Sequence, residues 1–221
     1  MKKLLYLFAL LLPWALRRRI LAAVFGYTLD PTSRIGLAWV MPDRLVMDAH
    51  STIGTFTVCK GLGLVHLGSH AIIGKANWVT GHPSCESKHF AHQQERRPEL
   101  ILGKHSSVTN RHFIDCTSSV TIGAFSVFAG LRSQILTHSV DFEHCRQSSA
   151  PITIGDYCFV GTDCVLLGGS SLPNNSVLGA KSLLNSHYLE PYWLYAGTPA
   201  RPVKRLAEDL AFFKRKVGFI D

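Results

Sequence analysis

The clearest pattern in the chain is an aliphatic residue at every sixth position between residues 154 and 184. The members of this series are Ile154, Val160, Leu166, Leu172, Leu178 and Leu184. Four positions after each of the first five stands a small residue, namely Cys158, Cys164, Ser170, Ser176 or Ser182. This period fits neither an α-helix nor a simple alternating strand, and it is typical of a short-stranded parallel β-helix. Three hexads then close one triangular coil, and the coils stack at about 4.8 Å per step.

The same period extends upstream with two interruptions. The upstream core positions form four triplets: Ile53, Cys59 and Val65; Leu67, Ile73 and Val79; Leu102, Val108 and Ile114; and Ile122, Phe128 and Gln134. Residues 82–99 and 139–153 exceed what a coil can hold, so we expect both segments to loop out. Each loop leaves after the third face of a coil, so both should emerge from one edge, about 10 Å apart. Loops on a rigid scaffold are where binding and chemistry concentrate.

The pattern predicts one domain with two appendages. Residues 1–30 form an apolar and basic N-terminal segment, residues 31–200 the β-helix, and residues 201–221 a C-terminal capping helix. The helix is expected because Leu206, Leu210 and Phe213 fall at helical spacing. Such a helix would cover the last coil, whose open sheet edge would otherwise invite aggregation.

The N-terminal segment leaves two alternatives open. The apolar run over residues 4–16 is broken by Pro13 and is shorter than the roughly 20 residues that a bilayer span needs. Arginines at 17–19 follow it directly. One alternative is an anchor at a membrane surface, with Trp14 at the interface. The other is a helix packed against the end of the β-helix or a neighbouring subunit.

Composition narrows the class of protein further. The six cysteines include no CxxC pair, which favours buried reduced thiols and a cytoplasmic location, with peripheral contact at the inner membrane face left open. The net charge of +8 is concentrated at the two ends of the chain. No nucleic-acid recognition motif accompanies that charge, so nucleic acid is not an expected partner.

Several motifs carry a resemblance to a known family. They are residues 134–141, the Pro-Ile-Thr-Ile-Gly segment at 151–155, the Gly-Ala-x-Ser coil at 179–182 and the Ala-Gly-x-Pro-Ala turn at 196–200. Together they resemble the hexapeptide-repeat acyltransferases over roughly residues 53–205, and within that superfamily the enzymes that O-acetylate sugars of surface polysaccharides. The resemblance implies a mainly β, left-handed parallel β-helix that forms homotrimers with active sites between subunits. It also implies direct transfer from acetyl-CoA to a hydroxyl of a sugar or lipid-linked saccharide, with no metal.

We interpret His138 as the general base of that transfer. It stands directly before the second loop, as in the family, and imidazole accepts a proton near neutral pH. Asp141 is a candidate to hold the ring in one tautomer. His82, in a Thr-Gly-His-Pro turn before the first loop, is a rival, but it lies about three coils from the coils expected to hold CoA. We therefore assign His82 to the acceptor pocket, with a plain turn residue as the alternative. His112 is expected either to line a cleft against a neighbouring subunit, where it would contact the substrate, or to be a surface histidine.

The CoA contacts are carried over from the resemblance by position. Thr162 is expected beside the pantetheine arm, Ala180 and Ser182 in the narrow coil, and Arg201 and Lys204 near the phosphates. One departure stands out, because residues 184–186 read Leu-Asn-Ser where the family has a Thr-Lys pair. The family's lysine contact therefore has no counterpart here.

Two other functions remain open on the sequence. A lyase of the γ-type carbonic-anhydrase branch would hold zinc on His112, His138 and His144. A non-catalytic scaffold would trimerise and organise a membrane-bound assembly. Bound zinc would favour the first, and a failure to bind CoA would favour the second.

Overall fold

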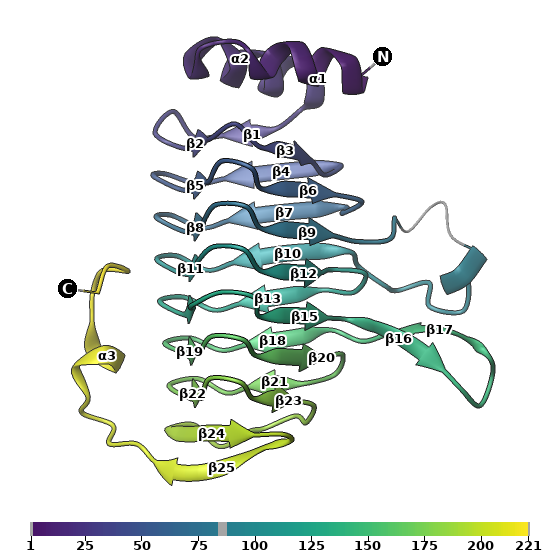
Figure 1. Ribbon diagram of the computed structural model, residues 1–221. Helices are drawn as coiled ribbons and strands as arrows, with labels where there is room; N and C mark the ends of the chain where they lie inside the picture. The colour runs from purple at the N-terminus through teal and green to yellow at the C-terminus, as the bar shows by residue number, and fades with distance from the viewer. Residues whose placement is uncertain (1, 84–87, 221) are drawn as a thin grey trace.

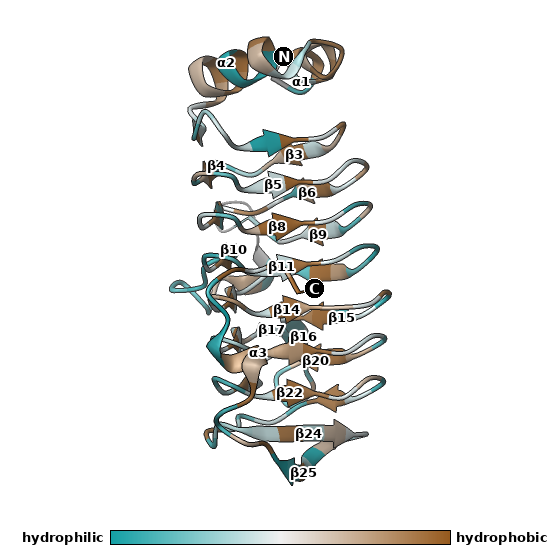
Figure 2. Ribbon diagram, turned by 90° about the vertical axis from the view of Figure 1, so that its left-hand side faces the viewer, coloured by the Kyte–Doolittle hydropathy of each residue, from teal (hydrophilic) through white to brown (hydrophobic). Residues whose placement is uncertain are grey.

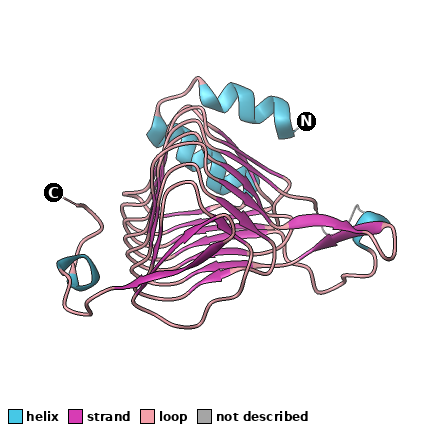
Figure 3. Ribbon diagram, turned by 60° about the horizontal axis from the view of Figure 1, so that its bottom comes forward, coloured by secondary structure: helices cyan, strands magenta, loops and turns pink. Residues whose placement is uncertain are grey.

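Three parallel β-sheets run the length of the molecule and form the faces of a triangular prism (Figures 1 and 3). This computed structural model describes residues 2–83 and 88–220. Face A contains β1 (Thr28–Leu29), β4 (Arg44–Met47), β7 (Leu64–Leu67), β10 (Glu99–Leu102), β13 (Val120–Ile122), β18 (Ile152–Ile154) and β21 (Ser171–Leu172). Face B contains β2 (Arg34–Ile35), β5 (Thr52–Ile53), β8 (Ile72–Ile73), β11 (Ser107–Val108), β14 (Val127–Phe128), β19 (Phe159–Val160), β22 (Val177–Leu178), β24 (Trp193–Gly197) and β25 (Ala200–Arg205). Face C contains β3 (Trp39–Met41), β6 (Val58–Lys60), β9 (Trp78–Thr80), β12 (Phe113–Asp115), β15 (Gln134–Leu136), β20 (Val165–Leu167) and β23 (Leu183–Leu184).

The hexad positions make the core, as the period predicts. All six aliphatic residues of the 154–184 series are buried, and so are the small residues that follow them. The small residues also link coils. Ser126 Oγ donates to Gly155 O at 2.6 Å and accepts from Cys158 N at 2.8 Å. At this corner a small polar side chain therefore has two roles: it fits beside the turn, and it satisfies backbone groups of the next coil.

One upstream core position is wrong. Gln134 is exposed, and Ile135 fills the core in its place, paired with Ile114 and Leu166 of the neighbouring coils. The reason is one extra residue in the corner before β15, which contains Gly130 with φ 74°. A Cβ at Gly130 would lie 2.3 Å from Thr162 Cβ, so the longer corner needs glycine.

Both extruded loops leave from the edge between faces C and A, which confirms that expectation (Figure 1). The first follows β9 and contains a short 3₁₀ turn, η1 (Lys88–Phe90). The second follows β15 and forms the antiparallel hairpin β16 (His138–Asp141) and β17 (Arg146–Ser149). β9 and β15 flank β12 on face C, so the loops emerge two coils apart. Gln93 of the first loop joins it to the second, because its side-chain amide donates through Nε2 to Ser149 O and accepts through Oε1 from Ser149 N.

The N-terminal segment packs on the first coil. Helices α1 (Lys2–Leu10) and α2 (Trp14–Phe25) lie across the end of the prism (Figure 1). Tyr6 Oη donates to Ala38 O at 3.2 Å, and the buried Arg17 donates to the carbonyls of the first coil. Trp14 donates to Ser33 O at 3.0 Å, so its polar end points to the protein and not to a membrane interface. Of the helices described, none is long and apolar enough to cross a membrane.

The C-terminal cap is a strand where a helix was expected. β25 pairs antiparallel with β24 and closes the last coil, and the helix is limited to α3 (Ala211–Lys214). A strand satisfies the unpaired backbone groups at the edge of β24, which a helix laid across them would leave open. The remaining tail turns back along the edge between faces A and B, where Gly218 N donates to His105 Nδ1 at 3.2 Å.

Candidate active site

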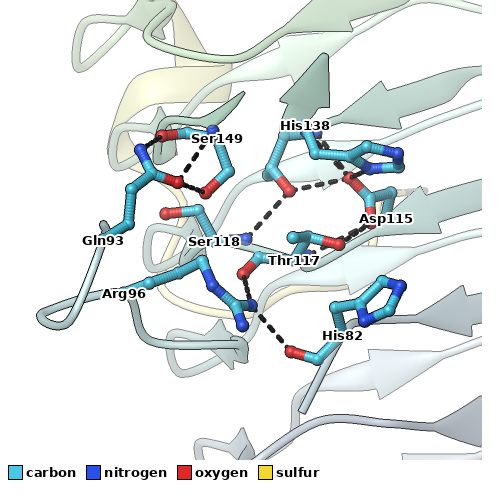
Figure 4. Close-up of polar contacts among 9 residues, drawn as sticks. His82, Gln93, Arg96, Asp115, Thr117, Ser118, His138 and Ser149 are labelled. Carbon is cyan, nitrogen blue, oxygen red and sulfur yellow. Dashed lines mark hydrogen bonds and ion pairs between the residues drawn. The ribbon is translucent and has the colours of Figure 1, made fainter. Parts of the chain in front are cut away.

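His138 stands where the second loop leaves the prism. It follows the buried Thr137 at the end of face C and is the first residue of the hairpin. Its Nδ1 lies 2.9 Å from Oδ2 of Asp115, the last residue of β12 on the neighbouring coil (Figure 4). The His138 side chain is 42% exposed and that of Asp115 only 4%. The ring therefore faces solvent while the coil stack holds its carboxylate partner.

Asp115 is an unusually well-satisfied carboxylate. Oδ2 accepts from Thr137 N and Oγ1 and from His138 N and Nδ1, and Oδ1 accepts from Thr117 N and Oγ1, at 2.6 to 3.2 Å. Burial raises the pKa of Asp115, but the hydrogen bonds from Thr117, His138 and Thr137 outweigh it and hold the pKa below its usual value. Asp115 is thus ionised and accepts only, so Nδ1 of His138 carries the proton. In the neutral ring, the lone pair is then on Nε2, which is the nitrogen that a general base needs.

The expectation that Asp141 holds the His138 ring is wrong. Asp141 Oδ2 lies 2.9 Å from His144 Nδ1 and 3.2 Å from Arg146 Nε, all within the hairpin. In the hairpin register, His138 pairs with Ser149 and Asp141 with Arg146, at opposite ends of β16. Three residues along an extended strand separate two side chains too far for contact.

His82 shares a pocket with His138. A small pocket of about 140 Å³ is lined by His82, His89, Phe90, His138 and Gln147. Arg96 connects the two sides of the site, because Nη1 donates to His82 O at 2.7 Å and to Thr117 O at 2.6 Å (Figure 4). Thr117 in turn bonds to Asp115. His82 and His138 follow strands that lie two coils apart, but both line one pocket together with residues of the two extruded loops.

His112 is neither a cleft residue nor a surface residue. Its ring is buried beside Phe128, Nδ1 accepts from Ser133 N at 3.2 Å, and Nε2 lies 2.9 Å from Thr109 Oγ1. Burial lowers the pKa of His112 to about 4, against weaker opposing hydrogen bonds. Both nitrogens are therefore used inside the fold, and the expected substrate contact is wrong. The same burial excludes His112 as a zinc ligand, and no group able to hold a metal ion occurs among the residues described.

The expected CoA contacts gather at another edge. Thr162 and Ala180 are exposed at successive corners between faces B and C, and the turn before Arg201 lies beneath them, where Thr198 Oγ1 donates to Lys181 O. Arg201 and Lys204 are exposed on β25. Ser182 does not fit its expected role, because it is buried and its Oγ accepts from Gly197 N at 3.1 Å. Face C separates this edge from His138, so one chain does not bring the two groups together.

Sequence reasoning missed three side chains of this site: Asp115, Arg96 and Gln93. The signal for Asp115 was present. Three positions after the buried aliphatic residues of β9, β12 and β15 stand His82, Thr117 and His138, and Asp115 directly follows the buried Ile114 of β12. Counting Gln134 as the core residue shifted that coil by one and hid the alignment. Arg96 and Gln93 lie in the first loop, where the repeat gives no register.

Comparisons with known proteins agree with this architecture. No protein-family model matches the chain. In sequence, it is 31% identical over 86 residues to the provisionally named colanic acid biosynthesis acetyltransferase WcaF of Escherichia coli K12, and equally to that of Shigella flexneri. The matched segment covers 38% of this chain and 47%, about half, of each relative.

Solved structures extend the likeness over most of the chain. The hexapeptide-repeat acetyltransferase VCA0836 of Vibrio cholerae, complexed with acetyl coenzyme A, aligns at 23% identity and a TM-score of 0.52, over 64% of this chain and 70% of that one. The polysialic acid O-acetyltransferase OatWY aligns at 20% identity and 0.52, over 81% and 84%. A hexapeptide transferase family protein of Anaplasma phagocytophilum aligns at 18% and 0.52, over 85% of each chain. The chain therefore has the left-handed parallel β-helix fold of the hexapeptide-repeat acetyltransferases.

Proposed function

We propose that this protein is an O-acetyltransferase that moves an acetyl group from acetyl-CoA to a sugar hydroxyl, with His138 as general base. The observation that carries the proposal is the 2.9 Å contact between His138 Nδ1 and the buried Asp115 carboxylate, at the mouth of a pocket between two extruded loops. A hydroxyl is a poor nucleophile at neutral pH, so acyl transfer to it needs a positioned base. The relative named as a colanic acid biosynthesis acetyltransferase and the structural neighbour named as a polysialic acid O-acetyltransferase support the choice of acceptor class.

In the proposed reaction, the sugar hydroxyl oxygen attacks the thioester carbonyl carbon while its proton passes to His138 Nε2. The C–S bond then breaks, the ester forms, and the proton returns from the imidazolium to the leaving CoA thiolate. Asp115 stabilises the imidazolium and keeps Nδ1 protonated throughout. Positioned acid–base groups of this kind contribute roughly 10²- to 10⁴-fold to a rate.

A second copy of the chain completes the site in this proposal. The pocket beside His138 has a volume of about 140 Å³. Pockets that bind small-molecule ligands usually span roughly 300–1,000 Å³, so this pocket alone is too small for the sugar and the acetyl-CoA together. The exposed Thr162 and Ala180, which suit a pantetheine arm, lie across face C. That face carries one outward column in continuous register, and six of its seven residues are apolar: Trp39, Val58, Trp78, Phe113, Gln134, Val165 and Leu183. Packing such columns together would bring the CoA edge of one copy to the His138 edge of another, as the resemblance to homotrimers implies.

The proposed activity is tested by CoA thiol release from acetyl-CoA with a panel of sugar acceptors, alongside direct CoA binding. His138→Ala should abolish turnover and leave CoA binding intact. His144→Ala is the matched control, because it removes a ring with the same 2.9 Å carboxylate contact outside the pocket. Turnover in His138→Ala equal to wild type would overturn the assignment of the base. A wild type that neither binds CoA nor turns over would favour a scaffold.

The assembly is tested by sedimentation of Trp78→Glu. We expect loss of the oligomer and of activity together. Ile72→Glu on face B is the control, because Ile72 and Trp78 are equally exposed at 45%. A wild type that is active as a monomer would contradict the shared site.

A further inference from the structure

The face of the N-terminal cap that points away from the β-helix is apolar. Helix α1 buries one stripe, with Tyr6 and Ala9 at 1% exposure, against the first coil. Its opposite stripe is also apolar and is exposed: Leu4, Leu7 and Phe8 of the helix and Leu11 of the turn directly after it, at 50% to 83%. These four residues recur at helical spacing, and a helix that is apolar all round needs an apolar neighbour on both sides. Together with the exposed Leu16 of α2, they are called the outer cap face.

Basic residues border the outer cap face without acidic ones. The first acidic residue of the chain is Asp30, beyond both helices. Lys3 and Arg19 are exposed, and Arg18 is partly exposed, whereas Arg17 is buried in contacts with the first coil. Apolar surface with a rim of cations alone is the composition of helices that lie in the headgroup region of anionic membranes.

The geometry suits a flat surface better than a bilayer span. Both helices lie across the end of the prism (Figure 1). Both contain segments coloured brown for hydrophobic residues (Figure 2). The nine residues of α1 reach only about 14 Å, less than half of the hydrocarbon thickness of roughly 30 Å. We propose that the outer cap face docks on an anionic phospholipid surface, with α1 and α2 in the plane of the interface.

Charge favours lipid over a second copy of the chain as the occupant. In a two-fold contact the same patch meets itself, so Lys3 and Arg19 of one copy would approach those of the other with no acidic residue to offset them. Anionic headgroups offset the same cations, by about 1 kcal/mol for each Lys or Arg near the surface, or roughly fivefold in binding. This docking is independent of the proposed acetyl transfer.

Flotation of the full chain with lipid vesicles tests the docking. We expect the wild type to float with phosphatidylcholine vesicles that contain 30% phosphatidylglycerol, on the order of tenfold more than with phosphatidylcholine alone. Raising the ionic strength should weaken the binding, because salt screens exposed charges. The double variant Phe8→Ser with Leu11→Ser should lose at least tenfold in binding. Arg19→Gln should lose about fivefold, and the exposed Arg44→Gln on face A should lose nothing.

The matched control is Phe56→Ser with Leu189→Ser. These residues are 75% and 76% exposed and belong to the β-helix and not to the cap helices. They should float like wild type, and thermal melts should show that all variants are folded. A wild type that stays with the unbound fraction overturns the proposal, and so does a Phe8, Leu11 variant that floats like wild type. A change in oligomer size of that variant, without a change in flotation, would instead assign the face to a second copy.

Discussion

Two histidine–aspartate pairs in this molecule have the same contact distance and different surroundings. His138 Nδ1 and His144 Nδ1 each lie 2.9 Å from a carboxylate oxygen. The first pair joins two coils across 23 residues of sequence, and its Asp115 is buried under six hydrogen bonds. The second pair is made within four residues of a hairpin, and the His144 side chain is 58% exposed. A contact distance alone therefore does not distinguish the proposed catalytic pair from the other, whereas the surroundings do, because only the first carboxylate is held in place by the scaffold.

The largest effect is expected when the carboxylates of the two pairs are neutralised and the resulting losses of activity are compared. Asp115→Asn should lower kcat by about 10²-fold, because a neutral amide no longer favours a proton on Nδ1 or stabilises the imidazolium. Asp141→Asn should change kcat less than twofold. The pH profile of kcat/KM checks the mechanism, since a merely structural loss would lower the rate without moving the profile. Equal losses in the two variants would remove the distinction between the pairs.

Among the residues described, His112 has no carboxylate partner, and we expect it to affect the pH dependence of the free energy of unfolding. The pKa of His112 is about 4 in the fold and about 6.5 when unfolded. Between these values the unfolded chain binds the extra proton, so stability is full above pH 6.5 and falls as the pH drops to 4, by about 3 kcal/mol. Denaturant unfolding from pH 7 to 4 measures the fall. The variant His112→Phe fills the site without a titrating group, so its loss of stability between pH 7 and 4 should be smaller by about 3 kcal/mol. An unchanged pH dependence would show that His112 does not cause the loss.

A smaller effect is expected at the other histidine of the pocket. His82→Ala should raise KM for the acceptor roughly tenfold while kcat stays within a few-fold, as when an interaction equal in ground and transition states is lost. His92→Ala, in the same loop and exposed, serves as the control. Steady-state kinetics with saturating acetyl-CoA separate the two constants. A loss in kcat as large as that of His138→Ala would make His82 the base.

The smallest effect concerns the contact between the loops. Gln93→Ala removes three neutral hydrogen bonds to Ser149, each with a net contribution of about 1 kcal/mol. Amide hydrogen exchange in the hairpin should rise while exchange in the coils stays constant, and activity should fall only a few-fold. Gln94→Ala, whose side chain is exposed, should leave exchange unchanged.

Much of the scaffold could be predicted from the chain because the hexad period is local and repeated. Each aliphatic residue of the 154–184 series needed only its own spacing to be placed in the core. The same count located both loops on one edge and put His138 at the root of the second. It failed at Gln134, where one extra corner residue beside Gly130 breaks the period without a strong local signal. The C-terminal cap failed for a different reason, because helical spacing in residues 206–213 competes with the backbone demand of an open sheet edge.

The sequence alone determined the prism, its two loops and the histidine at the second loop, because repeated side-chain spacing decides which positions are buried. Only the tertiary structure decided which carboxylate meets that histidine, since Asp115 and His138 become neighbours through coil register and not through proximity in the chain. It also decided that His82 enters the same pocket, that His112 and Ser182 are sealed inside, and that α1 keeps a second apolar stripe exposed. Each of these depends on which backbone groups and surfaces remain unsatisfied after the coils have stacked, and local spacing carries no information on that.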